Sequence, residues 1–462
     1  MSEDLAWATA SDIARAVASG AASALDVIDD TLARIAERNP ALNAFTAITA
    51  DRARRRARAI DARPDKATLP LAGVPFAVKN LFDVAGLATV AGSKINRARA
   101  KATRDSPLIE KLEAAGAVLV GALNMGEYAY DFTGENVHDG PSRNPHDTSR
   151  MTGGSSGGSG GAVAGGMVPL ALGSDTNGSI RVPSSFCGTF GLKPTYGRLS
   201  RARSFPFVAS LDHLGPFART TRDLALSYDA MQGFDAGDAA CVERPLEPAT
   251  PELARGLAGL RIAVAGGYFH KGAFAEALDA LARVAKAAGA TDVVEIPEAA
   301  RARAAAYVIT ATEGAALHLE RLRQQARDFD PAVRDRLIAA AMVPATLVDK
   351  AQNFRRWYRG EVLKLFARYD AILAPATPCT APKIGQQTFV IDGVELPVRP
   401  NVGIYTQPIS FIGLPVVAVP VPLTPLPIAV QIIAAPWRED IALRIAQALE
   451  QTGAAAAPRP NL

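Results

Sequence analysis

Apolar residues recur every three to four positions through the first sixty residues, which is the pattern of amphipathic helices. The clearest example is ALDVIDDTLARIAERNP (24–40), where Asn39-Pro40 predicts the end of the helix. A short helix that Ser11 can cap precedes it, and a third is expected through the arginine-rich run 52–58, whose charges are typical of a solvated helix face rather than of a binding patch. Residues 1–63 are therefore predicted to form a helical N-terminal layer.

Beyond this layer the pattern changes, because short apolar runs between turn residues begin to alternate with helical segments. GVPFAVKN (73–80) is the first predicted buried strand. Helix–strand pairs and further strands follow in SPLIEKLEAAGAVLVGALNM, GGAVAGGMVPLALGSD, RIAVAGG, DAILAP, PVVAVPV and PIAVQII. The alternation predicts an α/β fold with a largely parallel sheet covered by helices.

The segment 300–368 loses the strand signal and is predicted to be a helical region that covers one face of the sheet. The chain shows no internal repeat and no low-complexity linker. We therefore expect one domain, residues 1–462, rather than the three that its length alone would suggest.

Composition excludes several classes of protein. A net charge of +4 on 462 residues, without a basic stripe interleaved with aromatics, gives no indication of nucleic-acid binding. No run of about 18 apolar residues predicts a membrane span, and the acidic N-terminus has no signal-peptide pattern. Three widely spaced cysteines (Cys187, Cys241 and Cys379) show no metal-ligand spacing, so we expect no metal and a reduced, cytoplasmic setting.

The most distinctive segment is the glycine- and serine-rich run 151–166, MTGGSSGGSGGAVAGG. A flexible linker is disfavoured, since the run is short and lies between ordered segments. A phosphate-binding loop is disfavoured because neither GK[ST] nor a strand with GxGxxG and a later acid accompanies it. The remaining interpretation is a catalytic loop, in which glycines let backbone N–H groups approach a reacting oxygen.

A serine nucleophile in such a loop needs a base. None of the five histidines lies in a triad motif, and the chain has no GxSxG elbow. A lysine can serve if burial lowers its pKa toward neutrality. Lys79 is a candidate, because it follows the apolar strand VPFAV and would enter the interior.

Five motifs identify the chain as a member of the amidase signature family: LAGVPFAVKN, DVAGLATVAGS, GGSSGGSGG, GSDTNGSIRVPSSFCGTFGLKPT and SLDHLGP. The resemblance covers most of the chain. It implies a single α/β domain around a twisted mixed sheet and a serine amidohydrolase that needs no cofactor. By this resemblance Lys79 is the base, Ser155 is the bridging serine in a cis peptide after Gly154, and Ser179 is the nucleophile.

The resemblance also assigns the surroundings of the nucleophile. The oxyanion hole falls on the backbone N–H groups of Thr176, Asn177, Gly178 and Ser179 itself. Ser156, Asp175 and Arg181 are expected to support the loop. Asn177 departs from the family, which usually has glycine here, so the shape of the pocket is expected to differ while the nucleophile stays the same.

Within the family the chain most resembles two groups. One is the A subunit of glutamyl-tRNA amidotransferase, in which an arginine on a helix like KAQNFRRWY binds the carboxylate of glutamine; the matching residue is Arg355. The aspartate that holds the amino group of glutamine is replaced, since TPLPIAVQ places Thr424 there. The other group is the biuret-type hydrolases of cyanuric acid breakdown, especially 1-carboxybiuret hydrolase.

A small ureide with a carboxylate and no ammonium suits this combination of Arg355 and Thr424. We therefore expect cleavage of 1-carboxybiuret with release of ammonia, with Arg355 binding the substrate. The alternatives are the A subunit of an amidotransferase, a general amidase of small amides and, least favoured, a non-catalytic scaffold. The resemblance also implies a small helical partner like the C subunit of the amidotransferase, and hence a homo- or hetero-oligomer.

Overall fold

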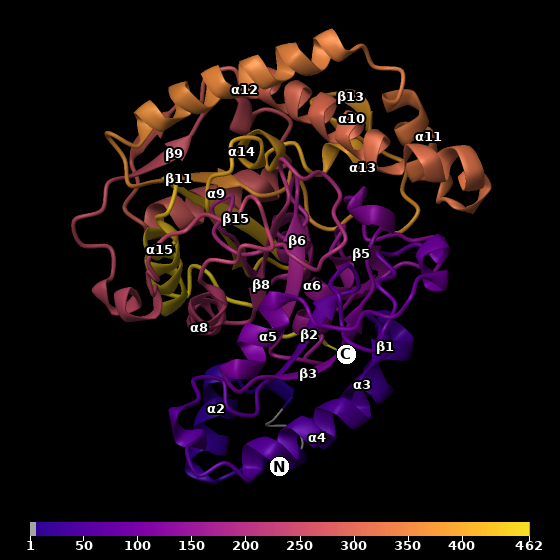
Figure 1. Ribbon diagram of the computed structural model, residues 1–462. Helices are drawn as coiled ribbons and strands as arrows, with labels where there is room; N and C mark the ends of the chain where they lie inside the picture. Colours follow the sequence, from indigo (N-terminus) through magenta and orange to yellow (C-terminus); the bar gives the residue numbers. More distant parts are fainter. Residues whose placement is uncertain (1–5, 462) are drawn as a thin grey trace.

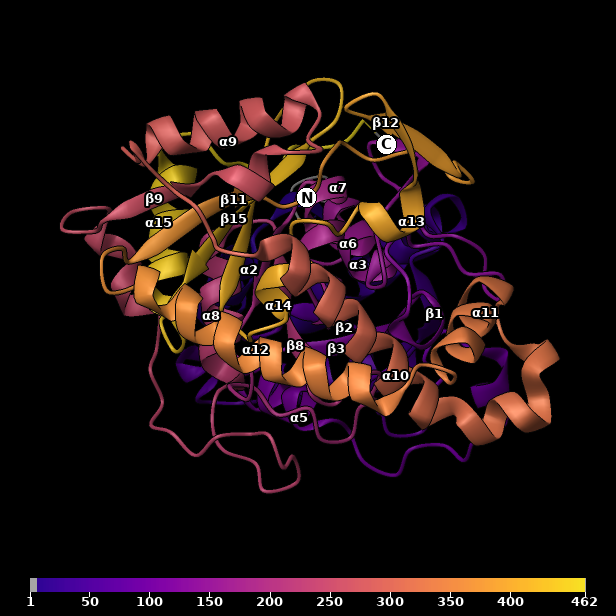
Figure 2. The same ribbon diagram turned by 90° about the horizontal axis from the view of Figure 1, so that it is seen from above.

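An eleven-stranded sheet forms the centre of the protein (Figures 1 and 2). The computed structural model describes residues 6–461. Across the sheet the strands lie in the order β1-β3-β2-β6-β8-β7-β14-β15-β11-β9-β10. In chain order they are β1 (Phe45–Ile48), β2 (Pro75–Lys79), β3 (Val118–Leu123), β6 (Leu170–Asp175), β7 (Phe190–Lys193), β8 (His213–Ala218), β9 (Ile262–Ala265), β10 (Asp292–Val294), β11 (Ala371–Pro375), β14 (Val416–Val421) and β15 (Ile428–Ala434).

The sheet is mixed, which confirms the fold implied by the family resemblance and corrects the expectation of a largely parallel sheet. Strand β2 is parallel to both β3 and β6, and β9 is parallel to β10 and β11. Between these groups, β8, β7, β14 and β15 run antiparallel to their neighbours. These strands are buried along their whole length, as parallel strands are, so hydrophobicity alone does not reveal their direction.

The N-terminal layer is built mainly from α2 (Ala10–Ser19), α3 (Ala24–Leu42) and α4 (Ala50–Asp61), at the lower edge of Figure 1. The expected all-helical layer is wrong at β1, which adds an antiparallel edge strand to β3. Helix α3 also continues through Pro40 and ends at Leu42, followed by Asn43 in a left-handed conformation. One short strand between two helices carries too few residues for its alternation to be recognised in the sequence.

The predicted helical cover is present as α10 (Ala299–Gln325), α11 (Pro331–Ala340) and α12 (Ala345–Leu365). Helix α10 packs against α11, α12 and α14 (Gln407–Ser410), and Figure 2 shows α10 and α12 running side by side. Since Ser410 of α14 donates to Asp175 at the end of β6, the cover brings residues from the second half of the chain toward that edge.

The remaining helices fill the space around the sheet, and two small hairpins lie outside it. The other α-helices are α5 (Pro107–Ala114), α6 (Gly157–Ala164), α7 (Arg181–Cys187), α8 (Thr221–Met231), α9 (Ala275–Ala287), α13 (Val398–Asn401) and α15 (Glu439–Gln451). The hairpins pair β4 (Arg143–Asn144) with β5 (Asp147–Met151) and β12 (Thr388–Ile391) with β13 (Val394–Pro397). Among residues 6–461, no helix combines the length and apolarity that crossing a bilayer requires.

Candidate active site

The site is formed where strands β2 and β6 end. The two strands are parallel neighbours, so their carboxyl ends meet at the same edge of the sheet. Lys79 is the last residue of β2, and Asp175 is the last residue of β6. The glycine-rich run ends in α6, which packs on β6 and α7 and brings Ser155 to the same place.

Lys79 is completely buried and contacts two serine hydroxyls. Its Nζ lies 2.7 Å from Ser155 Oγ and 2.8 Å from Ser174 Oγ. Burial lowers the pKa of Lys79 to about 7, and the negative charges of Asp212, Asp175 and Asp131 oppose this shift. A lysine with this pKa is largely neutral at mildly alkaline pH, which is the form that can accept a proton.

The glycine-rich run packs too closely for side chains at several positions. A Cβ on Gly158 would lie 2.6 Å from the backbone nitrogen of Asn124. The Gly154–Ser155 peptide bond is cis, in agreement with the resemblance. Ser156, one of the predicted supporting residues, donates from Oγ to the carbonyl of Ser174 at 3.1 Å and so ties the run to β6.

The loop 176–179 presents backbone donors beside Ser179. Within residues 6–461, the N–H groups of Asn177, Gly178 and Ser179 have no hydrogen-bond acceptor. Gly178 has φ = +146°, and a Cβ there would collide with the side chain of Thr406. Free N–H groups that converge beside a serine hydroxyl are the arrangement that stabilises an oxyanion.

Asp175 and Arg181 form a completely buried ion pair under this loop. Arg181 Nε and Nη2 each lie 2.9 Å from one oxygen of the Asp175 carboxylate. Arg181 also donates to the carbonyl of Thr406 and to Gln431 Oε1. Because Asp175 accepts from the backbone N–H of Ile180 as well, the pair fixes both ends of the loop that carries Ser179.

Other anchors of the loop were not predicted from the sequence. Thr176 donates to Asp212 Oδ1 at 2.6 Å, and Thr406 Oγ1 donates to the carbonyl of Asn177 at 2.6 Å. Asn177 Nδ2 donates to Thr310 Oγ1 on α10 at 2.8 Å. Asp212 belongs to the SLDHLGP motif, which was the only available signal; no sequence signal indicated Thr310 or Thr406.

Ser179 lines a small cavity, with an empty volume of about 380 Å³ that includes space open to solvent. The oxyanion loop and the segment 129–132 line part of it, and α10, α11, α13 and α14 line another part. The side chains around the cavity are those of Ala129, Tyr130, Asp131, Phe132, Thr176, Asn177, Phe207, Tyr307, Thr310, Arg336, Pro400 and Gln407.

Arg355 is not brought to this cavity. Its Nε donates to the carbonyl of Phe411 at 2.6 Å, and its Nη2 donates to the carbonyl of Ser210 at 2.8 Å. The guanidinium therefore joins the segment after α14 to the SLDHLGP loop. Thr424, which takes the place of the expected aspartate, is exposed in the turn between β14 and β15, outside the lining of the cavity.

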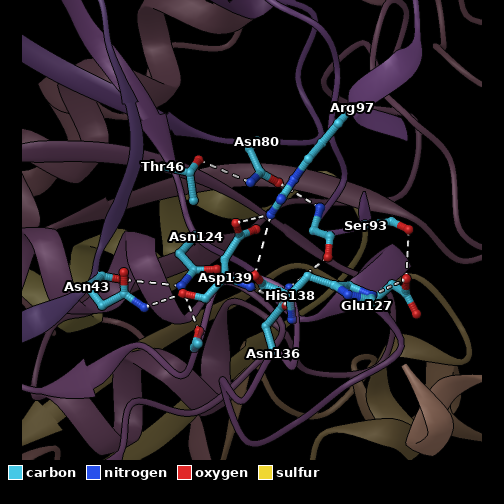
Figure 3. A network of polar contacts seen from close by, with 12 residues as sticks. Asn43, Thr46, Asn80, Ser93, Arg97, Asn124, Glu127, Asn136, His138 and Asp139 are labelled. Carbon is cyan, nitrogen blue, oxygen red and sulfur yellow. Dashed lines mark hydrogen bonds and ion pairs between the residues drawn. The ribbon is translucent and has the colours of Figure 1, made fainter. Parts of the chain in front are cut away.

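A second polar network lies beside the triad and supports the loops around it (Figure 3). Asn80, directly after Lys79, accepts the N–H of Gly92 and donates to Thr46. The buried Glu127 accepts from Ser93 and lies 2.9 Å from His138 Nε2. These contacts hold the DVAGLATVAGS motif in place and explain its position next to the site.

Comparison with known proteins agrees with this geometry. The sequence profile of the amidase family, described as Amidase, matches residues 26–443. The chain belongs to the amidase family. This membership confirms the predicted enzyme class, a hydrolase of carbon–nitrogen bonds other than peptide bonds.

Two curated relatives match nearly the whole chain. The AtzE subunit of 1-carboxybiuret hydrolase from Pseudomonas sp. (strain ADP) is 52% identical over 449 residues, covering 96% of this chain and 98% of the relative. The A subunit of glutamyl-tRNA(Gln) amidotransferase from Azotobacter vinelandii (strain DJ / ATCC BAA-1303) is 37% identical over 475 residues, covering 96% and 97%.

Solved structures of related proteins match the fold of this amidase over nearly its whole length. A structure described as a vestigial protein complex that reveals the origins of an s-triazine catabolic enzyme has a TM-score of 0.96 and 52% identity, covering 98% of this chain and 100% of that chain. The structure of 6-aminohexanoate cyclic dimer hydrolase has a TM-score of 0.87 and 30% identity, covering 99% of each chain.

Proposed function

We propose that this amidase hydrolyses 1-carboxybiuret with release of ammonia, using Ser179 as nucleophile, Ser155 as bridge and Lys79 as base. The observation that carries the mechanism is the buried Lys79 Nζ at 2.7 Å from Ser155 Oγ, and it is supported by the free N–H groups of the separate loop that carries Ser179. The 52% identity to a 1-carboxybiuret hydrolase chain supports the substrate.

In the proposed reaction, neutral Lys79 takes the proton of Ser155 while Ser155 takes that of Ser179. Ser179 Oγ attacks the terminal carbamoyl carbon, and the oxyanion is stabilised by the N–H groups of loop 176–179, each donor contributing about 3–4 kcal/mol. The proton returns through Ser155 to the leaving nitrogen, and ammonia departs as the C–N bond breaks. Water then cleaves the acyl-enzyme by the same route and leaves a carboxylate.

A panel of small amides and ureides scored by ammonia release tests this function. Freshly prepared 1-carboxybiuret should give the highest kcat/KM among carboxybiuret, biuret, allophanate, glutamine and an aryl amide. A clear preference for glutamine would instead identify the glutamine-hydrolysing chain of an amidotransferase, the second candidate that the 37% identity supports.

The proposed function includes a partner and a compartment. We infer a complex with a small helical subunit, supported by the solved relative described as a protein complex and by relatives that are themselves subunits. A cytoplasmic setting is supported by the three buried cysteines, none of which forms a disulfide. Purification of the native protein from its source tests whether a small subunit is bound. A fully active chain that carries no small subunit would exclude this partner.

A further inference from the structure

Two polar groups on the wall of the Ser179 cavity have unused hydrogen-bonding capacity. Asn177 is 6% exposed, and its Nδ2 donates to Thr310 Oγ1. Its Oδ1 is buried and accepts no hydrogen bond from residues 6–461. An unpaired buried carbonyl oxygen is costly, and a bound N–H group would satisfy it. This oxygen belongs to the residue that replaces the family's usual glycine.

Arg336 is the second group. It projects from α11 and lies over the ring of Tyr130, with its guanidinium carbon 3.8 Å from the ring centre. Its Nε donates to the carbonyl of Ala332 and its Nη2 to the carbonyl of Tyr130. In the described part of the chain, its Nη1 has no acceptor and its charge has no carboxylate partner.

The other arginines near the cavity are less suited to bind an anion. Arg399 is paired with Asp131 and Glu135, which neutralise its charge. Arg303 donates to Gln407, Asn401 and the carbonyl of Pro400 and does not line the cavity. Arg355 is occupied by two carbonyls outside it. Arg336 is thus the unpaired cation that, among residues 6–461, shares the cavity with Ser179.

We propose that Arg336 binds the carboxylate of the substrate through Nη1 and that Asn177 Oδ1 accepts an N–H group of its ureide chain. This assignment rests on the proposed function and replaces Arg355 as the group that selects for a carboxylate. It accounts for both chemical features of a carboxylated ureide: a carboxylate at the end remote from the scissile bond and N–H groups where a simple amide has methylenes.

Four substrates separate the two contacts. 1-Carboxybiuret carries both the carboxylate and the N–H groups. Glutaramate has a chain of equal length with the carboxylate but with methylenes in place of N–H, biuret has N–H groups without the carboxylate, and butyramide has neither. The measurement is kcat/KM for each substrate with the wild-type enzyme and with the variants Arg336→Gln, Asn177→Gly, Arg355→Lys and Thr310→Val.

Arg336→Gln removes a charge-assisted hydrogen bond to the carboxylate, so it should lower kcat/KM roughly a hundredfold for 1-carboxybiuret and glutaramate. The kcat/KM for biuret and butyramide should stay within a few-fold of the wild-type value. Asn177→Gly should lower kcat/KM about tenfold for the two ureides only. The control Arg355→Lys, outside the cavity, should change all four substrates alike. Thr310→Val removes the acceptor that orients the Asn177 amide, so it should weaken the preference for ureides in the same direction as Asn177→Gly.

Equal losses on all four substrates in Arg336→Gln and Asn177→Gly would overturn the inference, even if the wild-type enzyme prefers 1-carboxybiuret. A wild-type enzyme that cleaves butyramide and glutaramate but neither ureide would instead refute the proposed function. That result would also refute the assignment of Asn177. The assignment of Arg336 would then be decided by the ratio of kcat/KM for glutaramate to kcat/KM for butyramide, in the wild-type enzyme and in Arg336→Gln.

Discussion

Lys79 Nζ lies 2.7 Å from Ser155 Oγ, although the two residues are 76 positions apart and come from different elements of the fold. Three residues that share one proton path act as a unit, so their losses do not add. Ser179→Ala and Lys79→Ala should each reduce kcat at least roughly 10³-fold, and the double variant should be little slower than either. Circular dichroism controls for folding; substantial turnover by Ser179→Ala would exclude the mechanism.

The pH dependence of the activity should follow the protonation of Lys79. Burial lowers the pKa of Lys79 to about 7, and protonated Lys79 cannot accept a proton, so activity should be constant above that pH and fall about tenfold per unit below it. Lys193 provides a control, since burial also lowers its pKa to about 7 and it donates to the carbonyl of Pro194, away from the triad. A pH–rate profile of Lys193→Met that loses the acid limb would contradict this assignment.

Asp212 should affect the pH at which activity falls on the acid side. Its carboxylate is the largest of the charges that raise the pKa of Lys79 against the effect of burial. Asp212→Asn removes the charge, so the pKa of Lys79 should fall and the acid limb should move to lower pH. The bond from Thr176 is also weakened, and kcat at the plateau should decrease. Glu313→Gln, which alters a partner of Ser210 in the neighbouring loop, should leave the midpoint where it is.

The buried ion pair below the loop should matter for stability. Arg181→Met leaves the Asp175 carboxylate without its main partner, and this should cost about 3–5 kcal/mol of unfolding free energy in urea titrations. Arg181→Met combined with Asp175→Leu removes both charges and should recover part of the loss. If the double variant is less stable by the sum of both single losses, the pair does not act as a unit.

Metal removal should have no effect on the rate. Among residues 6–461, no three His, Cys, Asp or Glu side chains gather as ligands for an ion, and the proposed mechanism requires none. Prolonged dialysis against a chelator should leave kcat/KM unchanged. A loss that zinc or manganese restores would favour a metal hydrolase instead.

The parts of the site that lie in contiguous motifs could be predicted from the sequence. Lys79 and Asp175 each end a strand, Ser155 lies in the glycine-rich run, and the structure brings all three to the same edge of the sheet. Arg336 and Thr310 could not be predicted, because amphipathic helices present many polar residues and only tertiary packing decides which of them faces a cavity. The same limit explains Arg355, whose sequence context does not reveal that two carbonyls occupy it.

The helical cover has a consequence for how this enzyme can change. The groups proposed to break the bond all come from residues 79–181, whereas Arg336, Thr310 and Tyr307 reach the cavity from α10 and α11, which belong to a separate stretch of chain. Substitutions in those two helices can therefore alter which molecule fits without moving the nucleophile, its bridge or its base. Apart from Asn177, the protein thus keeps the groups proposed to break the bond separate from those of α10 and α11 that face the substrate, and new substrates can be acquired by changing these two helices.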